Sequence, residues 1–91
     1  METKPFLLEG AALELNVDAR EGSVLVEALD QEGHPLSGYT RSEAQVMEGV
    51  DELRLRPRWT SHTDLAELTG KGVRLKFHLR NARLYAFQVR R

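Results

Sequence analysis

Regular alternation of apolar and polar residues is the feature of this sequence that most limits its fold. At 13–18 the apolar residues Leu13, Leu15 and Val17 are separated by polar ones, and at 73–80 four apolar residues are separated by basic residues or histidine. Successive side chains of a β-strand point to opposite faces, so each stretch can bury one face and expose the other. Both stretches are therefore predicted to be half-buried strands.

Turn signals follow the first of these strands. The segment AREG at 19–22 is predicted to turn the chain into a second strand over 23–30, which is rich in β-branched and aliphatic residues. An antiparallel hairpin is expected here. Asp30, Gly33 and Pro35 then predict another turn, because Asp initiates turns, Gly accepts a positive φ and Pro sets an extended chain.

The middle of the chain is less regular. Residues 36–52 keep neither a period of two nor one of 3.6, which indicates a short edge strand near 36–41 followed by a long loop. A strand is expected again over 53–60, with a proline that suits a sheet edge or a bulge. Its predicted inward face comprises Leu53, Leu55, Pro57 and Trp59.

One short helical turn is expected between this strand and the last part of the chain. Asp64 and Glu67 have the spacing of a capping box, and Gly70 stands where a helix would stop.

The end of the chain, LYAF in particular, is apolar on both faces of its predicted strand. Strands at 73–80 and 83–89 are expected to be joined tightly at Asn81 and Ala82, with Tyr85, Phe87 and Val89 facing the core. Leu84 and Ala86 would then point to the opposite face. Either a partner domain covers them, or long side chains such as Arg54, Arg74 and Lys76 lay their aliphatic stems over them.

These elements predict an all-β fold. At least five strands and one short helical turn favour an antiparallel two-sheet β-sandwich of jelly-roll or concanavalin-like type, because an open sheet would leave an apolar face uncovered. A chain of 91 residues suits a single domain over 1–91. Since the first strand is expected within a few residues of Met1, the domain is interpreted as a module excised from a longer chain. No apolar run is long enough to span a membrane, no signal peptide is recognised, and the compartment stays unknown.

Charge is distributed unevenly along the chain. Residues 1–52 carry twelve acidic and three basic residues, whereas residues 53–91 carry two acidic and ten basic ones. A nucleic-acid surface is one interpretation. Pairing of acidic strands beside basic ones is favoured instead, because no basic cluster is interleaved with exposed aromatic residues. No nucleic-acid partner is expected.

No catalytic, cofactor or metal site is predicted. His34, His62 and His78 lack the spacing of a ligand set, and there is no cysteine. His62 and Asp64 could meet on one loop, but the simpler explanation is that Asp64 caps the helix that follows and His62 is solvated. A glycosidase-like acid pair would need a groove that a small sandwich rarely encloses; the acids considered for it are Glu9, Glu14, Glu27, Asp30 and Glu43.

Two aromatic residues are candidates for ligand contact. Sugar-binding sandwiches stack pyranose rings on exposed aromatic side chains, which draws attention to Tyr39 and Trp59. Trp59 shares the parity of Leu53 and Leu55, which favours a core position. Tyr39, beside Gly38, is the better candidate for an exposed platform.

Several motifs together resemble a known module. SVLVEALDQEGHPLSGY and RPRWTSHTDLAELTGKGVRLKFHLRNARLYAF are similar to the C-terminal β-sandwich accessory module that follows a five-bladed propeller in bacterial glycoside-hydrolase-like proteins. A Glu-Asp-Cys segment common in that family reads Ser42, Glu43, Ala44 here. In the family the propeller holds the catalytic acids, so the resemblance implies a non-catalytic module with no functional residues to carry over. The matching positions are Val24, Val26, Glu27, Leu29, Asp30, Gly33, Pro35, Gly38, Trp59, Asp64, Leu65, Gly70, Lys71, Phe77, Ala82, Leu84, Tyr85 and Phe87.

Three hypotheses follow for function. The first is an accessory module that packs against a carbohydrate-active propeller domain, using Leu84 and Ala86. The second is a carbohydrate-binding module that uses Tyr39 and Trp59. The third is a structural domain that self-associates as a homodimer through a sheet edge or face.

Overall fold

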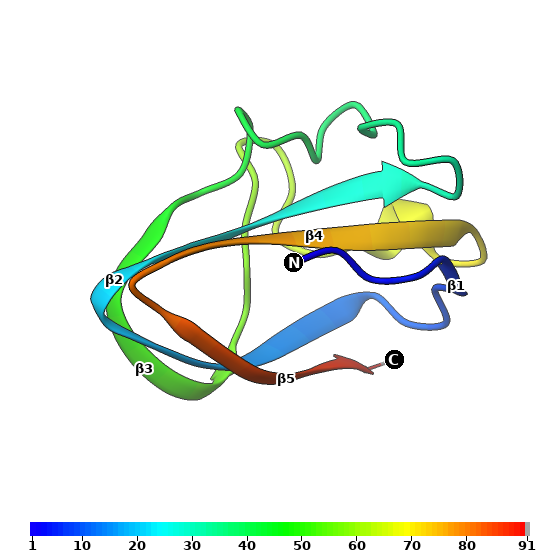
Figure 1. Cartoon of the computed structure of the whole chain (residues 1–91). Helices are drawn as coiled ribbons and strands as arrows, with labels where there is room; N and C mark the ends of the chain where they lie inside the picture. Colours follow the sequence, from blue (N-terminus) through cyan, green and yellow to red (C-terminus); the bar gives the residue numbers. More distant parts are fainter. Residues whose placement is uncertain (91) are drawn as a thin grey trace.

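The computed structural model describes residues 1–90, and its regular structure is almost entirely β. The five strands form one antiparallel sheet in the order β1-β4-β2-β3, with β5 also paired to β2 (Figure 1). The all-β prediction is confirmed; in place of two separate sheets there is one sheet that folds over on itself. The elements are β1 (Phe6–Leu7), β2 (Ala12–Asp30), β3 (Met47–Leu55), the 3₁₀ turn η1 (Ala66–Leu68), β4 (Gly72–Arg80) and β5 (Arg83–Arg90).

The predicted hairpin around residues 19–22 is wrong, because β2 is a single strand of 19 residues that continues through this segment. Its first part, Ala12–Asp18, pairs with β5, and its second part, Ser23–Asp30, pairs with β4. Figure 1 shows the strand bending sharply between the two parts. A tight two-residue hairpin needs residues with positive φ, and within the described chain none of residues 19–22 has one.

The final two strands are not a hairpin either. Both β4 and β5 run antiparallel to β2, so β5 continues in the direction of β4 after a break at Asn81 and Ala82. Asn81 has a φ of 48°, in the left-handed region that Asn adopts more readily than most residues. The break lies opposite the bend of β2, so β2 and the β4–β5 segment turn the same corner together.

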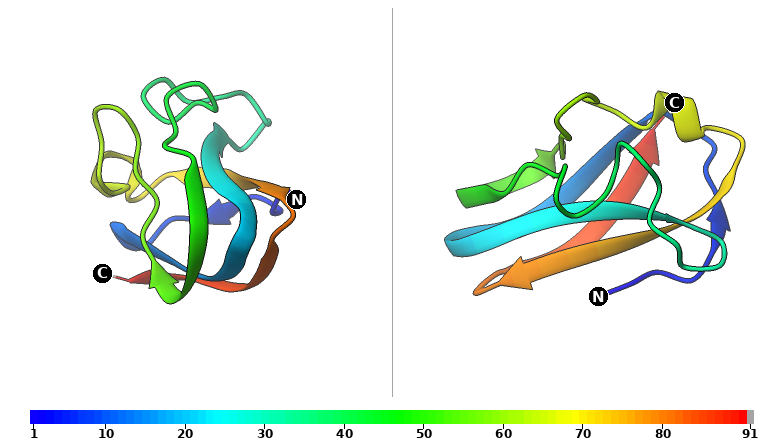
Figure 2. Two further views of the ribbon diagram at one scale, coloured as in Figure 1. Left: turned by 90° about the vertical axis from the view of Figure 1, so that its left-hand side faces the viewer. Right: turned by 90° about the horizontal axis from the view of Figure 1, so that it is seen from above.

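The edge strand β3 begins earlier than predicted. It starts at Met47, inside the segment interpreted as a loop, and pairs with β2 from Leu15 to Val24 (Figure 2). Most of its residues are exposed, since β3 has a neighbour on only one side. An edge strand exposed to water does not need alternating apolar residues, so the sequence of residues 47–52 carries no strand-like periodicity.

The core lies between the two halves of the folded sheet. Three of the predicted inward residues of β4 are buried there: Val73, Leu75 and Phe77. Loop residues such as Tyr39, Trp59 and Leu65 close the open side of the core.

Met47, the first residue of β3, pairs with Val24, and beyond Val24 loop residues take the place of β3 beside β2. The Trp59 indole donates a hydrogen bond to the Val26 carbonyl at 2.9 Å, and Ala28 N–H donates to the Tyr39 carbonyl at 3.0 Å. Trp59 is buried as predicted, although the strand expected over 53–60 ends at Leu55 and Trp59 lies in the segment beyond it.

The helical turn predicted near residue 64 is confirmed as η1. The carboxylate of Asp64 accepts a hydrogen bond from Ala66 N–H at 3.0 Å, and Gly70 follows with a φ of 88°. The predicted capping box is wrong, because Leu65 occupies the N-cap position without a side-chain cap and Glu67 contacts His62 instead.

Candidate functional site

The candidate site is the surface formed by the outward side chains of β3, the first half of β2, and β5, which we call the outer face. Strand alternation directs the apolar residues of 13–17 into the core and leaves Glu14, Asn16 and Asp18 on this surface. The facing residues on β5 are Gln88, Ala86 and Arg83, in that order.

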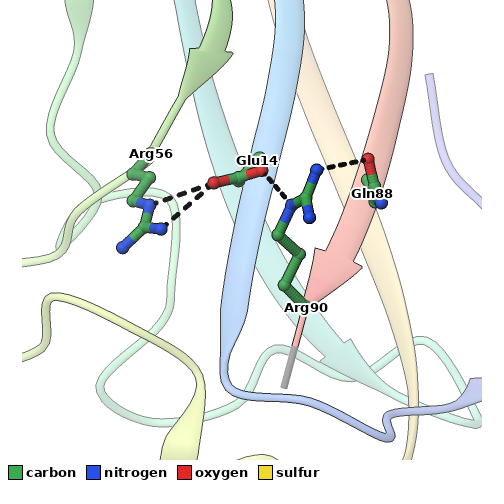
Figure 3. Close-up of polar contacts among 4 residues, drawn as sticks. All are labelled: Glu14, Arg56, Gln88 and Arg90. Atoms are coloured by element: carbon green, nitrogen blue, oxygen red, sulfur yellow. Dashed lines mark hydrogen bonds and ion pairs between the residues drawn. The ribbon is translucent and has the colours of Figure 1, made fainter.

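At one end of the outer face, Glu14 is held by two arginines (Figure 3). Arg56 Nη2 donates to one carboxylate oxygen at 3.1 Å, and Arg90 Nε donates to the other. Only 6% of Glu14 is exposed. The hydrogen bond from Arg90 is the largest influence on the Glu14 pKa; it and Arg56 outweigh the opposing effect of burial, so the pKa lies below its usual value. This ion triad joins the acidic first half of the chain to its basic second half, as charge pairing across strands predicted.

In the middle of the outer face, a β-bulge changes the direction of the LYAF side chains. Leu15 pairs with Phe87 and Val17 pairs with Leu84, so β5 places one more residue between these pairs than β2 does. Leu84 and Phe87 therefore both pack against the core, and Tyr85 is 60% exposed. The predicted positions of Leu84 and Tyr85 are wrong, whereas Ala86 is exposed as expected.

A second bulge lies directly across β2. Leu15 pairs with Leu55, but Val17 pairs with Glu52, so β3 also has an extra residue beside Asn16. Leu53 consequently points to solvent with 75% of its surface exposed, instead of sharing an inward face with Leu55. Ala86 and Leu53 flank Asn16 in a shallow depression of about 270 Å³ that also includes Glu14 and Arg90.

At the other end of the outer face, Asp18 lies opposite Asp51 on β3, a pairing of like charges that would be destabilising alone. Arg20 compensates it: its Nη2 lies 3.0 Å from an Asp18 carboxylate oxygen, and its Nε lies 3.7 Å from one of Asp51. Hydrogen bonds from Arg20 keep the pKa of Asp18 below its usual value. An open depression of about 770 Å³ lies beside this pair; it is lined by Asp18, Arg20, Glu21, Asn81, Ala82, Arg83 and Tyr85.

Tyr39 and Trp59 lie elsewhere, in the loops that close the core. Tyr39 is 1% exposed, and its ring meets that of Trp59 edge to face at a centroid distance of 5.2 Å. The expectation of an exposed Tyr39 platform is therefore wrong, because the ring fills the gap between the sheet and the loops. Burial raises the pKa of the Tyr39 hydroxyl, which has no hydrogen-bond partner within the described chain.

The loop histidine His62 is packed rather than solvated. Its ring stacks on Tyr39 at 4.4 Å, and its Nε2 lies 3.0 Å from a carboxylate oxygen of Glu67, not of Asp64. Its Nδ1 is buried without a hydrogen-bond partner among residues 1–90. The Asp64 carboxylate instead accepts a hydrogen bond from Ala66 N–H at the start of η1.

The remaining histidines have separate carboxylate neighbours. His34 Nδ1 lies 3.4 Å from Asp30 in the turn after β2, and His78 Nε2 lies 3.0 Å from Glu27. Within residues 1–90 no three histidine, cysteine or acidic side chains are grouped so as to hold a metal ion. Among the same residues no helix is long and apolar enough to cross a membrane.

Sequence reasoning missed Leu53 and Tyr85 as the large exposed apolar side chains of the outer face. Strand alternation predicts both side chains to face the core, but each lies beside a bulge that turns it to the opposite face. The only sequence signal was the excess of apolar residues in LYAF, since one strand cannot bury four consecutive side chains on one face. Comparisons of this chain with protein-family models, with curated proteins and with solved structures give no match.

Proposed function

We propose that this chain is a non-catalytic, sandwich-like accessory module that packs against a carbohydrate-active propeller domain through its outer face. The class of partner comes from the motif resemblance described above. The observation that supports docking is the pair of bulges on either side of Asn16, which leaves Leu53 exposed next to Ala86.

The layout of the outer face supports a protein partner. Protein interfaces have an apolar centre with a polar rim, and here Leu53 and Ala86 lie between the Glu14 triad and the Asp18–Arg20 pair. Full burial of one leucine side chain contributes about 1.5 to 3 kcal/mol. Leu53 and Tyr85 are therefore the residues on this face from which a partner would gain most.

Calorimetric titration of the chain with a propeller domain encoded in the same open reading frame or operon tests the proposal. Leu53→Asp should weaken binding at least about tenfold, since it places a charge at the centre of the contact. Leu7→Asp is the matched control, because Leu7 is 57% exposed on β1, away from the outer face. Absence of any such propeller domain, or equal effects of the two variants, would contradict the proposal.

The carbohydrate-binding alternative loses the two residues that motivated it. Tyr39 and Trp59 are both buried and in mutual contact, so neither ring offers a face to a sugar without opening the core. A saccharide site on this fold requires a different aromatic residue.

Self-association is less favoured at the edge of β3. Glu48, Asp51 and Glu52 lie along this edge strand, and a second copy would bring the same acids together. Sedimentation of the chain at high concentration tests this alternative, which requires a concentration-dependent dimer.

A further inference from the structure

The depression at the corner of the sheet has the features of a separate ligand site. It lies where β2 bends and where β4 gives way to β5, so residues from three segments meet there. Its open volume is about 770 Å³. It shares no lining residue with the Leu53 depression used for the proposed docking.

Tyr85 gives this depression an aromatic wall. The bulge removes Tyr85 from the core, whose positions are taken by Leu84 and Phe87, and leaves it 60% exposed. A phenol ring combines a flat apolar surface with a polar edge. A pyranose ring is complementary to it, since one face of the sugar presents C–H groups and its rim presents hydroxyl groups.

The polar groups around Tyr85 are held in place. Arg20 Nε and Nη2 each donate to a different oxygen of Asp18, at 3.1 and 3.0 Å, and this two-point contact orients the two side chains toward each other. The backbone of Asn81 is held in the left-handed region against Gly22. Ordered donors and acceptors lower the entropy lost when a ligand binds.

The charges of the depression balance. Its ionisable lining consists of two acids, Asp18 and Glu21, and two bases, Arg20 and Arg83. A phosphate-bearing ligand would need an excess of positive charge, whereas a neutral ligand rich in hydroxyl groups needs hydrogen bonds without net charge. We therefore propose that the Tyr85 depression binds a neutral saccharide chain, with Tyr85 as the stacking surface and Asp18, Arg20 and Asn81 as hydrogen-bonding partners. Asp18 and Arg20 also belong to the rim of the proposed docking face, so the saccharide site is tested on the chain without a partner domain.

Affinity electrophoresis of the 91-residue chain in gels that contain a single polysaccharide tests this site. The probes are mixed-linkage β-glucan, xyloglucan, arabinoxylan, glucomannan, laminarin and soluble starch, with polygalacturonate as the charged comparison. At least one neutral polysaccharide should retard the native chain. Tyr85→Ala should weaken that retardation about tenfold or more, equivalent to about 1.4 kcal/mol, and Tyr85→Phe should retain most of it because stacking needs only the ring.

Leu7→Ala is the matched control, because it removes another exposed apolar side chain, on β1 and outside the depression. Circular dichroism melting of each variant shows whether it is folded. Three results would overturn the saccharide site: no retardation by any neutral polysaccharide, equal retardation of native chain and a folded Tyr85→Ala, or retardation by polygalacturonate alone. Loss of propeller binding in Leu53→Asp has no bearing on these outcomes.

Discussion

Gly22 lies with its Cα directly against the main-chain carbonyl of Arg80, at the corner where β2 bends. A Cβ at position 22 would be 1.8 Å from the Arg80 carbonyl oxygen and 2.5 Å from that of Asn81. Because both contacts are with backbone, no side-chain rotation can relieve them. The missing side chain of Gly22 therefore allows β2 and the β4–β5 segment to turn the same corner in contact.

Gly22→Ala is expected to destabilise the fold by about 2 to 4 kcal/mol, since the added methyl group forces one of the two strands to move. In a domain of this size each kcal/mol lowers the melting temperature by about 4 to 8 °C. Gly33→Ala is the matched control: its Cβ would enter open space, so only the positive φ of 88° is unfavourable, costing about 1 to 2 kcal/mol. Similar losses in both variants would show that the corner contact is unimportant.

The bulge in β5 predicts opposite results at two nearby positions. Leu84→Asp should destabilise the domain by about 1 to 3 kcal/mol, because Leu84 packs against the core and the variant would place a charge at a partly buried position. Ala86→Asp should change stability by less than about 0.5 kcal/mol, because Ala86 is exposed. Urea unfolding measures both. A tolerated Leu84→Asp would mean that Leu84 points outward and that the bulge is misplaced.

The hydroxyl of Tyr39 predicts a neutral or stabilising substitution. It is buried without a partner in the described chain, so Tyr39→Phe removes an unsatisfied polar group and keeps the ring packed on Trp59 and His62. Trp59→Phe should instead cost about 2 kcal/mol or more, since it leaves the Val26 carbonyl without its donor and removes core volume. Thermal melting of the two variants compares them, and a destabilised Tyr39→Phe would indicate a bound water or an unrecognised partner.

The Glu14 triad predicts loss of stability in acid. The folded pKa of Glu14 is lowered, first by the hydrogen bond from Arg90, so its contribution is fully present above the unfolded glutamate pKa of about 4.3 and disappears as the pH falls through the folded pKa. The lowered pKa values of Asp18, Asp30 and Glu43 act with the same sign.

Glu14→Gln should therefore reduce stability at pH 7 and flatten the decline of unfolding free energy below about pH 4.5. Urea titrations at a series of pH values measure this slope. Glu32→Gln is a suitable control, because the Glu32 carboxylate is largely exposed and its ion-pair partner is the exposed His34. An acid slope for Glu14→Gln equal to that of the native chain would contradict the role of the triad.

Local patterns were sufficient for the elements whose environment is simple. The inward residues of β4, the burial of Trp59 and the presence of a short helical turn after Asp64 were predicted correctly. Each depends on short-range periodicity or on a hydrogen bond between residues close in sequence. The all-β class followed from the same alternation, because it recurs along the chain.

Tertiary structure alone decided the bend of β2, the direction of β5 and the exposure of Tyr85. The sequence of residues 19–22 suits a turn as well as a bent strand. A bent strand forms because Gly22 packs against the backbone of Arg80, a residue distant in sequence. One extra residue in a bulge moves every side chain beyond it to the opposite face of the sheet, as Leu84 and Tyr85 show. Periodicity within one strand carries no information about that residue, since a bulge is defined by register against a neighbouring strand.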